Sequence, residues 1–199
     1  MEEIISKEEV NQIMNTEGEI RGLGLKGYTN FILKEKGKEG LKRLEDAMAE
    51  LGYPIKHREI KATNFYPVGL DNLLLLSIKK LFNYDNKKFR EIGEFQAKSP
   101  LIIRLFVKYF ISLEKAVKAA PQMWRKYFTV GNMKMVDFNK EKKHVILRLE
   151  NFRLNLPHCQ LIIGFISALI KIIVGSKVIC EETKCIFRGD EYHEFLLKW

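Results

Sequence analysis

Cysteine, proline and uninterrupted apolar sequence are scarce in this chain. Its 199 residues include three cysteines and five prolines, and we expect no membrane span because no run of about 20 apolar residues is present. An odd, small number of cysteines argues against a disulfide scaffold and favours a reducing, cytoplasmic location. The N-terminal sequence "MEEIISKEEV" lacks the apolar core of a secretory signal. The 46% hydrophobic content indicates a packed globular protein.

Catalytic motifs are missing as well. The chain has no G-x-S-x-G, H-E-x-x-H or Walker sequence. Its histidines, His57, His144, His158 and His193, are scattered. His158 adjoins Cys159, but neighbouring residues on a helix point apart, which makes them a poor catalytic pair. We therefore expect no catalytic residues, with an enzyme as the alternative.

The sequence has no purely basic tract. The net charge of +9 is of the kind that attracts nucleic acid or anionic lipid. In "LKEKGKEGLKRLED" and "NKEKKH", however, lysines alternate with glutamates, a pattern typical of a solvated surface. No RNA-recognition, zinc-finger or basic-zipper signature is present. We therefore expect no nucleic-acid partner.

Gly22, Gly24 and Gly27 have the G-x-G-x-x-G spacing of a dinucleotide-binding loop. Such a loop must follow a buried parallel strand and open a helix, so that backbone N–H groups meet the phosphates. The preceding "NTEGEIR" holds one apolar side chain and does not fit a central parallel strand. We interpret the glycines as a flexible entry to a helix and expect no dinucleotide.

Hydrophobic periodicity predicts an α+β fold with segregated helices and strands. Ser6 and Glu9 have the spacing of a capping box at a first helix, and further helical segments follow. "NMKMVDF" and "HVILRLENF" alternate around a charged turn and predict an antiparallel hairpin. After an apolar helix, "SKVICEE" and "KCIFRGDEYHEFLLKW" predict two or three closing strands with a turn at "RGDE". We expect one domain over residues 1–199, helical over about 1–130 and sheet-containing over about 131–199.

The helix over residues 161–174 is apolar nearly all round. Its polar or small positions fall at intervals of four, three and four residues and form one narrow stripe, comprising Gln160, Gly164, Ser167 and Lys171. The run is too short for a membrane span, so we expect protein to enclose it. It is either the central core element or, in part, a dimer contact or the wall of an apolar ligand site.

Cys185 and His193 are equidistant from Gly189, where a turn is expected. They would then face each other on antiparallel strands with Cβ atoms about 5 Å apart, which suits two ligands of a zinc site. The remaining ligands would have to come from Cys180, Cys159 and His158. A buried cysteine beside a half-exposed histidine is the commoner outcome of such a pair. We therefore assign no metal and keep zinc at Cys185 and His193 as the alternative.

The C-terminal third carries a pattern of turns and cysteines. A Cys and a "GF" open the apolar helix, a Gly ends it, and the strands carry a Cys and a Gly-Asp turn. The residues concerned are Cys159, Gly164, Phe165, Gly175, Cys185, Gly189 and Asp190. This pattern resembles the closing part of 4-vinyl reductase-type domains. His193 stands where that pattern usually has a second cysteine, so an inherited metal site would need His193 as a substitute ligand.

The earlier segments "KGYTNFILKEKGKEGLKRL", "EIGEFQAKSP" and "AAPQMWRKYFTVGNM" are similar to a bacterial family of about this length, of unknown function, known from myxobacteria. Both groups are related in fold to the heme nitric-oxide-binding domains and to subunits of the TRAPP trafficking complex. The resemblance implies an α+β domain, often dimeric, that encloses an apolar small molecule or acyl chain and acts as a sensor or scaffold.

The heme version of this fold makes specific demands on the sequence. Heme iron needs an axial ligand, usually histidine. No histidine occurs between Arg58 and Lys143, the region that supplies the proximal ligand in heme nitric-oxide sensors, and their Y-x-S-x-R propionate-binding motif is absent. We therefore expect no heme, although another pocket ligand fits the resemblance.

Together these observations predict a non-catalytic sensor or scaffold that binds an apolar small molecule, an acyl chain or a protein partner as a homodimer. A pocket is expected among helical aromatic residues and the apolar helix, at Phe106, Phe110, Trp124, Phe128, Phe165 and Leu169. One alternative is an enzyme acting on a flat hydrophobic, tetrapyrrole-like substrate, as the reductase name suggests. Another is a purely structural dimer with a filled core.

Overall fold

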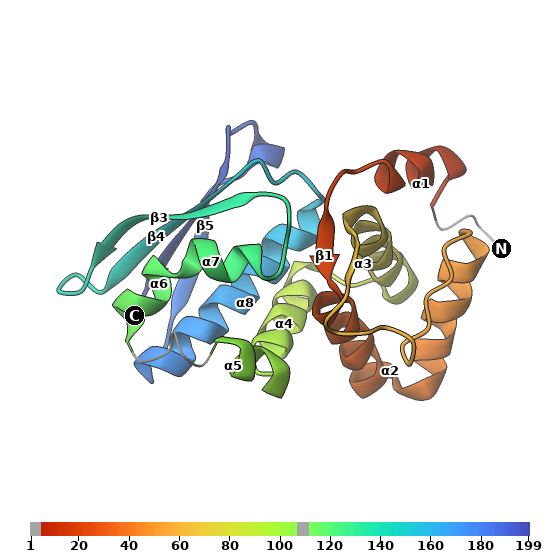
Figure 1. Cartoon of the computed structure of the whole chain (residues 1–199), viewed down its shortest axis with the longest axis horizontal. Coiled ribbons are helices and arrows are strands. Elements are labelled where there is room, and N and C mark those ends of the chain that lie inside the picture. The colour runs from red at the N-terminus through yellow and green to blue at the C-terminus, as the bar shows by residue number, and fades with distance from the viewer. Residues whose placement is uncertain (1–4, 107–111) are drawn as a thin grey trace. The chain divides into compact units, whose positions relative to one another are not determined.

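The computed structural model describes residues 5–106 and 112–199. The chain divides into two compact units, Met1–Lys88 and Phe89–Trp199. Among the described residues the first unit is mainly helical, and the second combines helices with a four-stranded antiparallel sheet (Figure 1). The predicted α+β class is therefore confirmed. That the whole chain forms one domain stays a prediction.

The first unit contains long helices and a two-stranded sheet. Its elements are α1 (Lys7–Met14), β1 (Glu19–Arg21), α2 (Gly22–Glu50), β2 (Phe65–Pro67) and α3 (Val68–Phe82). At α1, the Ser6 hydroxyl accepts a hydrogen bond from the Glu9 N–H, and the Glu9 carboxylate accepts one from the Ser6 N–H, so the predicted capping box is confirmed. Gly37 breaks α2 with a left-handed φ of 70°.

Gly22, the first residue of α2, is required by packing. The preceding strand β1 pairs antiparallel with β2, with Ile20 opposite Tyr66, and is not the parallel strand that a dinucleotide loop needs. A Cβ atom at Gly22 would overlap the Lys61 carbonyl and the Tyr66 ring. Close approach of the backbone, rather than flexibility, therefore requires glycine there.

The second unit contains helices and one four-stranded sheet. Its elements are α4 (Asn86–Ala97), which starts at the end of the first unit, α5 (Pro100–Phe106), α6 (Leu113–Lys118), α7 (Ala120–Arg125), β3 (Asn132–Asn139), β4 (His144–Glu150), α8 (Leu156–Val174), β5 (Ile179–Lys184), the 3-10 turn η2 (Ile186–Arg188) and β6 (His193–Lys198). The strand order is β3-β4-β6-β5, with every neighbouring pair antiparallel. The expected sequence of hairpin, apolar helix and closing strands is thus confirmed.

Alternating burial gives the sheet an inner and an outer face. On β4 the buried residues are Val145, Leu147 and Leu149. Their partners on β6 are Leu197, Phe195 and His193, which are buried as well. A strand directs alternate side chains to opposite faces, so His193 belongs to the inner, apolar face.

Helix α8 packs within this unit, as its composition predicts. Ten of its residues are buried, and 56% of its most apolar window lies inside the protein, although by length and composition alone it could cross a membrane. Its small polar stripe meets α4: a Cβ at Gly164 would overlap the Arg90 carbonyl, one at Gly93 would overlap the Leu161 carbonyl, and Arg90 Nε donates to Gln160 Oε1 at 2.7 Å. The part of the stripe at Gln160 and Gly164 is therefore a helix-crossing surface.

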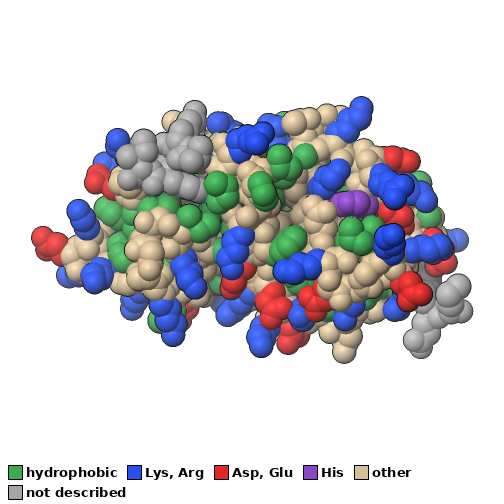
Figure 2. All heavy atoms as spheres, turned by 90° about the horizontal axis from the view of Figure 1, so that it is seen from below, with side chains coloured by type: hydrophobic (Ala, Val, Ile, Leu, Met, Phe, Trp, Pro, Cys, Tyr) green, Lys and Arg blue, Asp and Glu red, His purple; other side chains and the backbone are tan. Residues whose placement is uncertain are grey.

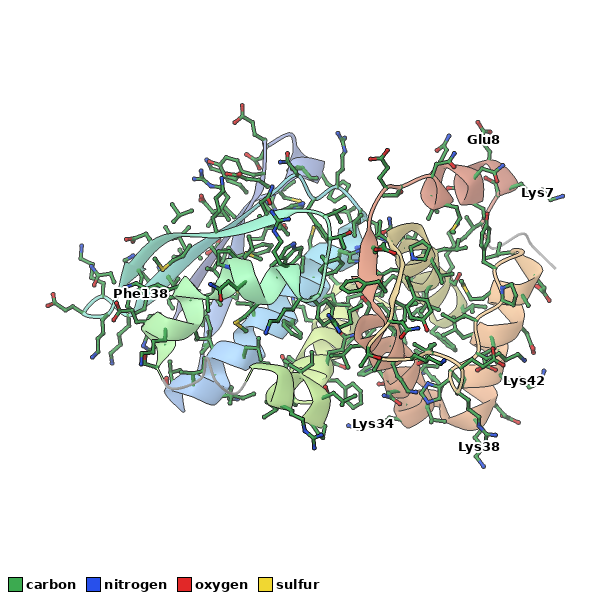
Figure 3. The ribbon with its side chains drawn as sticks, in the orientation of Figure 1. Lys7, Glu8, Lys34, Lys38, Lys42 and Phe138 are labelled. Atoms are coloured by element: carbon green, nitrogen blue, oxygen red, sulfur yellow. The ribbon has the colours of Figure 1, made fainter. Side chains whose placement is uncertain are left out.

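Basic and acidic side chains are intermixed on the face of the protein shown in Figure 2. Lys and Arg side chains are spread over the face seen in Figure 2, with Asp and Glu among them. Lys34, Lys38 and Lys42 on α2 point away from the ribbon (Figure 3), and Lys42 pairs with Asp46 at 2.5 Å. Exposed pairs of this kind add little stability, and they support the interpretation of a solvated surface.

Candidate metal centre

Four side chains with metal-ligating atoms meet between α8 and the closing strands. Cys159 lies near the start of α8, Glu182 on β5, Cys185 directly after β5, and His193 at the start of β6. One ligand atom from each lies within 4.8 Å of all the others. Cys159, Cys185 and His193 are at most 2% exposed, and the Glu182 side chain is 5% exposed. The cluster is closed to solvent.

Local sequence explains how each element reaches this point. Asn155 caps α8 by accepting the His158 N–H, which begins the helix early enough to turn Cys159 inward. The Asp190 carboxylate accepts the Cys185 N–H at 2.8 Å, and Gly189 takes a left-handed φ of 96° between them. The tight turn thereby returns the chain so that His193 lies near Cys185.

Three of the distances within the cluster are close to those of a tetrahedral zinc site. The two Sγ atoms of Cys159 and Cys185 are 3.8 Å apart, and two thiolates bound at the usual Zn–S length would be separated by about 3.8 Å. Cys159 Sγ lies 3.8 Å from His193 Nδ1, and that nitrogen lies 3.0 Å from Glu182 Oε1. Because the four ligand atoms extend to 4.8 Å from one another, a single ion bound to all four would draw the most distant ones together by about 1 Å.

The histidine is oriented as a metal ligand usually is. His193 Nε2 lies 2.9 Å from the Phe152 carbonyl, which can only accept a hydrogen bond, so Nε2 carries a proton. Nδ1 then faces the Glu182 carboxylate and the Cys159 sulfur. A lone pair beside a carboxylate is repulsive unless a proton or a metal cation lies between them. The Nε2 contact is the outer hydrogen bond that fixes a ligating imidazole.

Both cysteines of the cluster are held as neutral thiols when no ion is present. Burial raises the pKa of the Cys159 thiol, and the nearby Glu182 carboxylate and Cys185 raise it further. Burial also raises the pKa of the Cys185 thiol. Without an ion both thiols stay protonated at neutral pH, whereas a divalent cation displaces these protons and neutralises the buried carboxylate.

The sequence located part of this cluster. Cys185 and His193 come together as their symmetry about Gly189 predicts, and Cys159 joins them. Of the other suggested ligands, Cys180 lies outside the cluster, and the His158 Nδ1 bonds Asn155 Oδ1 at 2.8 Å instead. Glu182 was missed. Its signal was strand periodicity, because Glu182 lies opposite Phe195, two residues from His193 on the same face.

The predicted ligand-binding residues are only partly described. Phe106 ends α5, its side chain lies outside the described part, and Phe110 falls in residues 107–111, which are not described. Trp124 and Phe128 stack with ring centroids 4.6 Å apart. On α8, Phe165 lies 6.0 Å from the Tyr127 ring, and Leu169 is 7% exposed. That these residues line a pocket stays a prediction.

No protein-family model and no curated protein matches the chain. Several solved structures are similar to this chain in fold. An H-NOX protein from S. oneidensis, in the Fe(II)NO ligation state, aligns with a TM-score of 0.67 at 10% identity over 90% of this chain and 98% of that one. A Tt H-NOX aligns with a TM-score of 0.65 at 14% identity over 90% and 95%. A TRAPP complex subunit 3 from Naegleria fowleri, covalently bound to palmitic acid, gives 0.46 at 15% identity over 64% and 93%.

This likeness contradicts the expectation of no heme, because the neighbours include proteins described by their heme and its ligation state. The expectation depended on the missing histidine between Arg58 and Lys143 and on the missing Y-x-S-x-R motif, but tyrosine and cysteine also hold heme iron. Heme therefore returns as a candidate cofactor. At this low identity the comparison shows one thing plainly: the chain has the fold of the heme nitric-oxide-binding (H-NOX) domains.

Proposed function

We propose that the protein is a non-catalytic ligand-binding sensor or scaffold domain whose second unit is held together by structural zinc. The observation that carries this proposal is the closed, buried set of Cys159, Glu182, Cys185 and His193. Structural zinc sites use four protein ligands, whereas catalytic ones keep a position for water or substrate. Thiolate and imidazole ligands favour zinc over calcium or magnesium. The bound ion would cross-link α8 to both closing strands.

Zinc content measures this site directly. The purified full chain should carry one zinc per polypeptide by elemental mass spectrometry, and Cys159→Ser and Cys185→Ser should each lose it. Cys180→Ser is the matched control, because Cys180 lies on β5 outside the cluster. A parent protein without zinc after expression and reconstitution in zinc-containing medium would refute the proposed centre, as would equal loss in the control.

The ligand is proposed to be an apolar small molecule, with heme among the candidates. The fold supports this, since H-NOX domains with the same fold hold heme. The aromatic stack of Trp124 and Phe128, with Phe165 and Leu169 on α8, brings together apolar side chains of the kind that such ligands contact, and the burial of Phe128 and Leu169 would place the ligand in the interior. Native mass spectrometry before and after denaturation tests this proposal together with the predicted homodimer. A mass equal to bare polypeptide plus zinc would favour the structural alternative with a filled core.

The resemblance to 4-vinyl reductase-type domains remains part of the proposal. We also propose that the protein is cytoplasmic. Its residues have distinct roles in this fold: Gly164 allows the α4 crossing, Gly175 ends α8 with a φ of 67°, and Asp190 holds Cys185. Reduction of a tetrapyrrole by the purified protein would instead support the enzyme alternative.

A further inference from the structure

Phe152 links two features of the second unit. It lies in the segment between β4 and α8 and is 3% exposed. Its main-chain carbonyl accepts the hydrogen bond from His193 Nε2 at 2.9 Å. Its ring packs edge-on to Trp124, with centroids 5.0 Å apart, and edge-on to Phe128, at 5.2 Å. One residue therefore contacts a metal-ligand candidate through its backbone and the aromatic stack through its side chain.

The Phe152 ring is held tightly in this place. A Cβ atom at Gly131 would lie 3.0 Å from Phe152 Cδ2 and 3.1 Å from Phe152 Cβ, so the backbone closes on the ring from that side. The His158 ring packs edge-on to it at 5.8 Å. The preceding residue, Asn151, has a left-handed φ of 54°. A shift of the Phe152 carbonyl must therefore move the ring, because neither the backbone nor its neighbours leave it free space.

The aromatic rings that contact Phe152 are also held in place. Trp124 and Phe128 stack at 4.6 Å, and the Trp124 indole N–H donates to the Val130 carbonyl at 2.8 Å. Phe152 closes this stack edge-on, which is a favoured arrangement for aromatic rings. We call Trp124, Phe128 and Phe152 the aromatic triad.

We propose that Phe152 couples the zinc site to the aromatic triad, so that metal uptake fixes the ring packing against which an apolar ligand would bind. The inference depends on the proposed zinc site. Zinc holds His193 through Nδ1, His193 holds the Phe152 carbonyl through Nε2, and the Phe152 ring holds the triad. Coupling is reciprocal: a ligand bound against the triad and zinc change each other's affinity by the same factor, typically about 5- to 150-fold. Phe152 is thus a positioning residue for both sites.

Tryptophan fluorescence reports the triad. The chain has two tryptophans, so Trp199→Phe leaves Trp124 as the sole emitter. Zinc chloride is titrated into the chelator-treated Trp199→Phe protein while an indicator dye measures free zinc. Trp124 emission should change and saturate at one equivalent. In the Phe152→Leu variant, which keeps the backbone carbonyl, zinc should still bind while most of the emission change disappears.

Phe187→Leu is the matched control, because the Phe187 ring lies 5.9 Å from the His193 ring, on η2 and away from the triad in sequence. It should keep the full response. Absence of zinc binding by the parent would overturn the proposed function itself. Zinc binding with silent Trp124 would overturn only the coupling, and a full response in Phe152→Leu would overturn the role of its ring.

A second measurement covers the case in which Phe152→Leu does not fold. Phe128→Leu loosens the triad from the other end, because Phe128 contacts the Phe152 ring, and it leaves both His193 and the Phe152 carbonyl group in place. Reciprocity predicts that this variant binds zinc at least about fivefold more weakly than the parent, measured by chelator competition. An unchanged zinc dissociation constant would refute the coupling.

Discussion

Removal of the proposed zinc ion should lower the melting temperature of the second unit by about 17 °C. The ion would join α8 to both closing strands, so the folded state binds it and the unfolded chain, without the assembled site, does not. At free zinc about a thousandfold above the dissociation constant, this linkage stabilises the folded state by about 4 kcal/mol. The second unit spans Phe89–Trp199. Its unfolding entropy is roughly 0.23 kcal/mol/K, from the usual value per residue, and 4 kcal/mol then corresponds to about 17 °C.

Differential scanning calorimetry of the full chain measures this shift, with zinc in excess and then with a chelator. Cys180→Ser should reproduce the shift, whereas Cys185→Ser should begin at the low melting temperature and hardly respond. A chelator that demonstrably removes the zinc and leaves the transition unmoved would show that the ion does not hold the unit together. A shift in Cys185→Ser equal to that of the parent would place the stabilising ion elsewhere.

Three further predictions concern packing, capping and pH. Gly164→Ala should destabilise the protein by about 1–3 kcal/mol in urea titrations, because the new methyl group overlaps the Arg90 carbonyl; an unchanged midpoint would mean that α4 moves aside freely. Ser6→Ala should cost about 1 kcal/mol by removing the α1 cap, and helix content that survives with equal stability would contradict the role of the cap. Burial raises the pKa of Cys180 to about 12, so its neutral thiol stabilises the fold below about pH 8.5 and this contribution is lost as pH rises toward 12. Urea midpoints across that range should fall more steeply than in Cys180→Ala, and parallel curves would count against the shift.

Elements whose local signals agree with their packing were predictable. The capping box at Ser6 forms from neighbouring residues alone, and the alternation of β4 over His144–Glu150 records burial on one face. The closing segment was harder, since two or three strands fit its sequence equally well. In the structure a 3-10 turn replaces the additional strand, because Asp190 holds the Cys185 N–H and Gly189 reverses the chain. Side-chain bonds of that kind compete with strand pairing in ways that periodicity does not register.

The candidate metal centre shows why only part of the cluster could be predicted from the sequence. Cys185 and His193 are related by a turn, and turn symmetry is a local property. Strand alternation places Glu182 on the inner face of the sheet. A carboxylate in the sequence "CEETK" is nevertheless expected to be exposed to solvent, because burial of an isolated charge is too costly. The sequence around Glu182 does not show that Cys159, on the distant helix α8, packs beside it, and this tertiary contact is what makes Glu182 a candidate metal ligand. The evidence that Glu182 belongs to the site is therefore its burial beside the His193 ring, at 5% side-chain exposure, and not the residue type alone. Arg188 Nη1 already lies 3.6 Å from Glu182 Oε2, whereas Glu182 Oε1 faces His193 Nδ1, close to the two thiols, which is the place where the proposed zinc ion would bind.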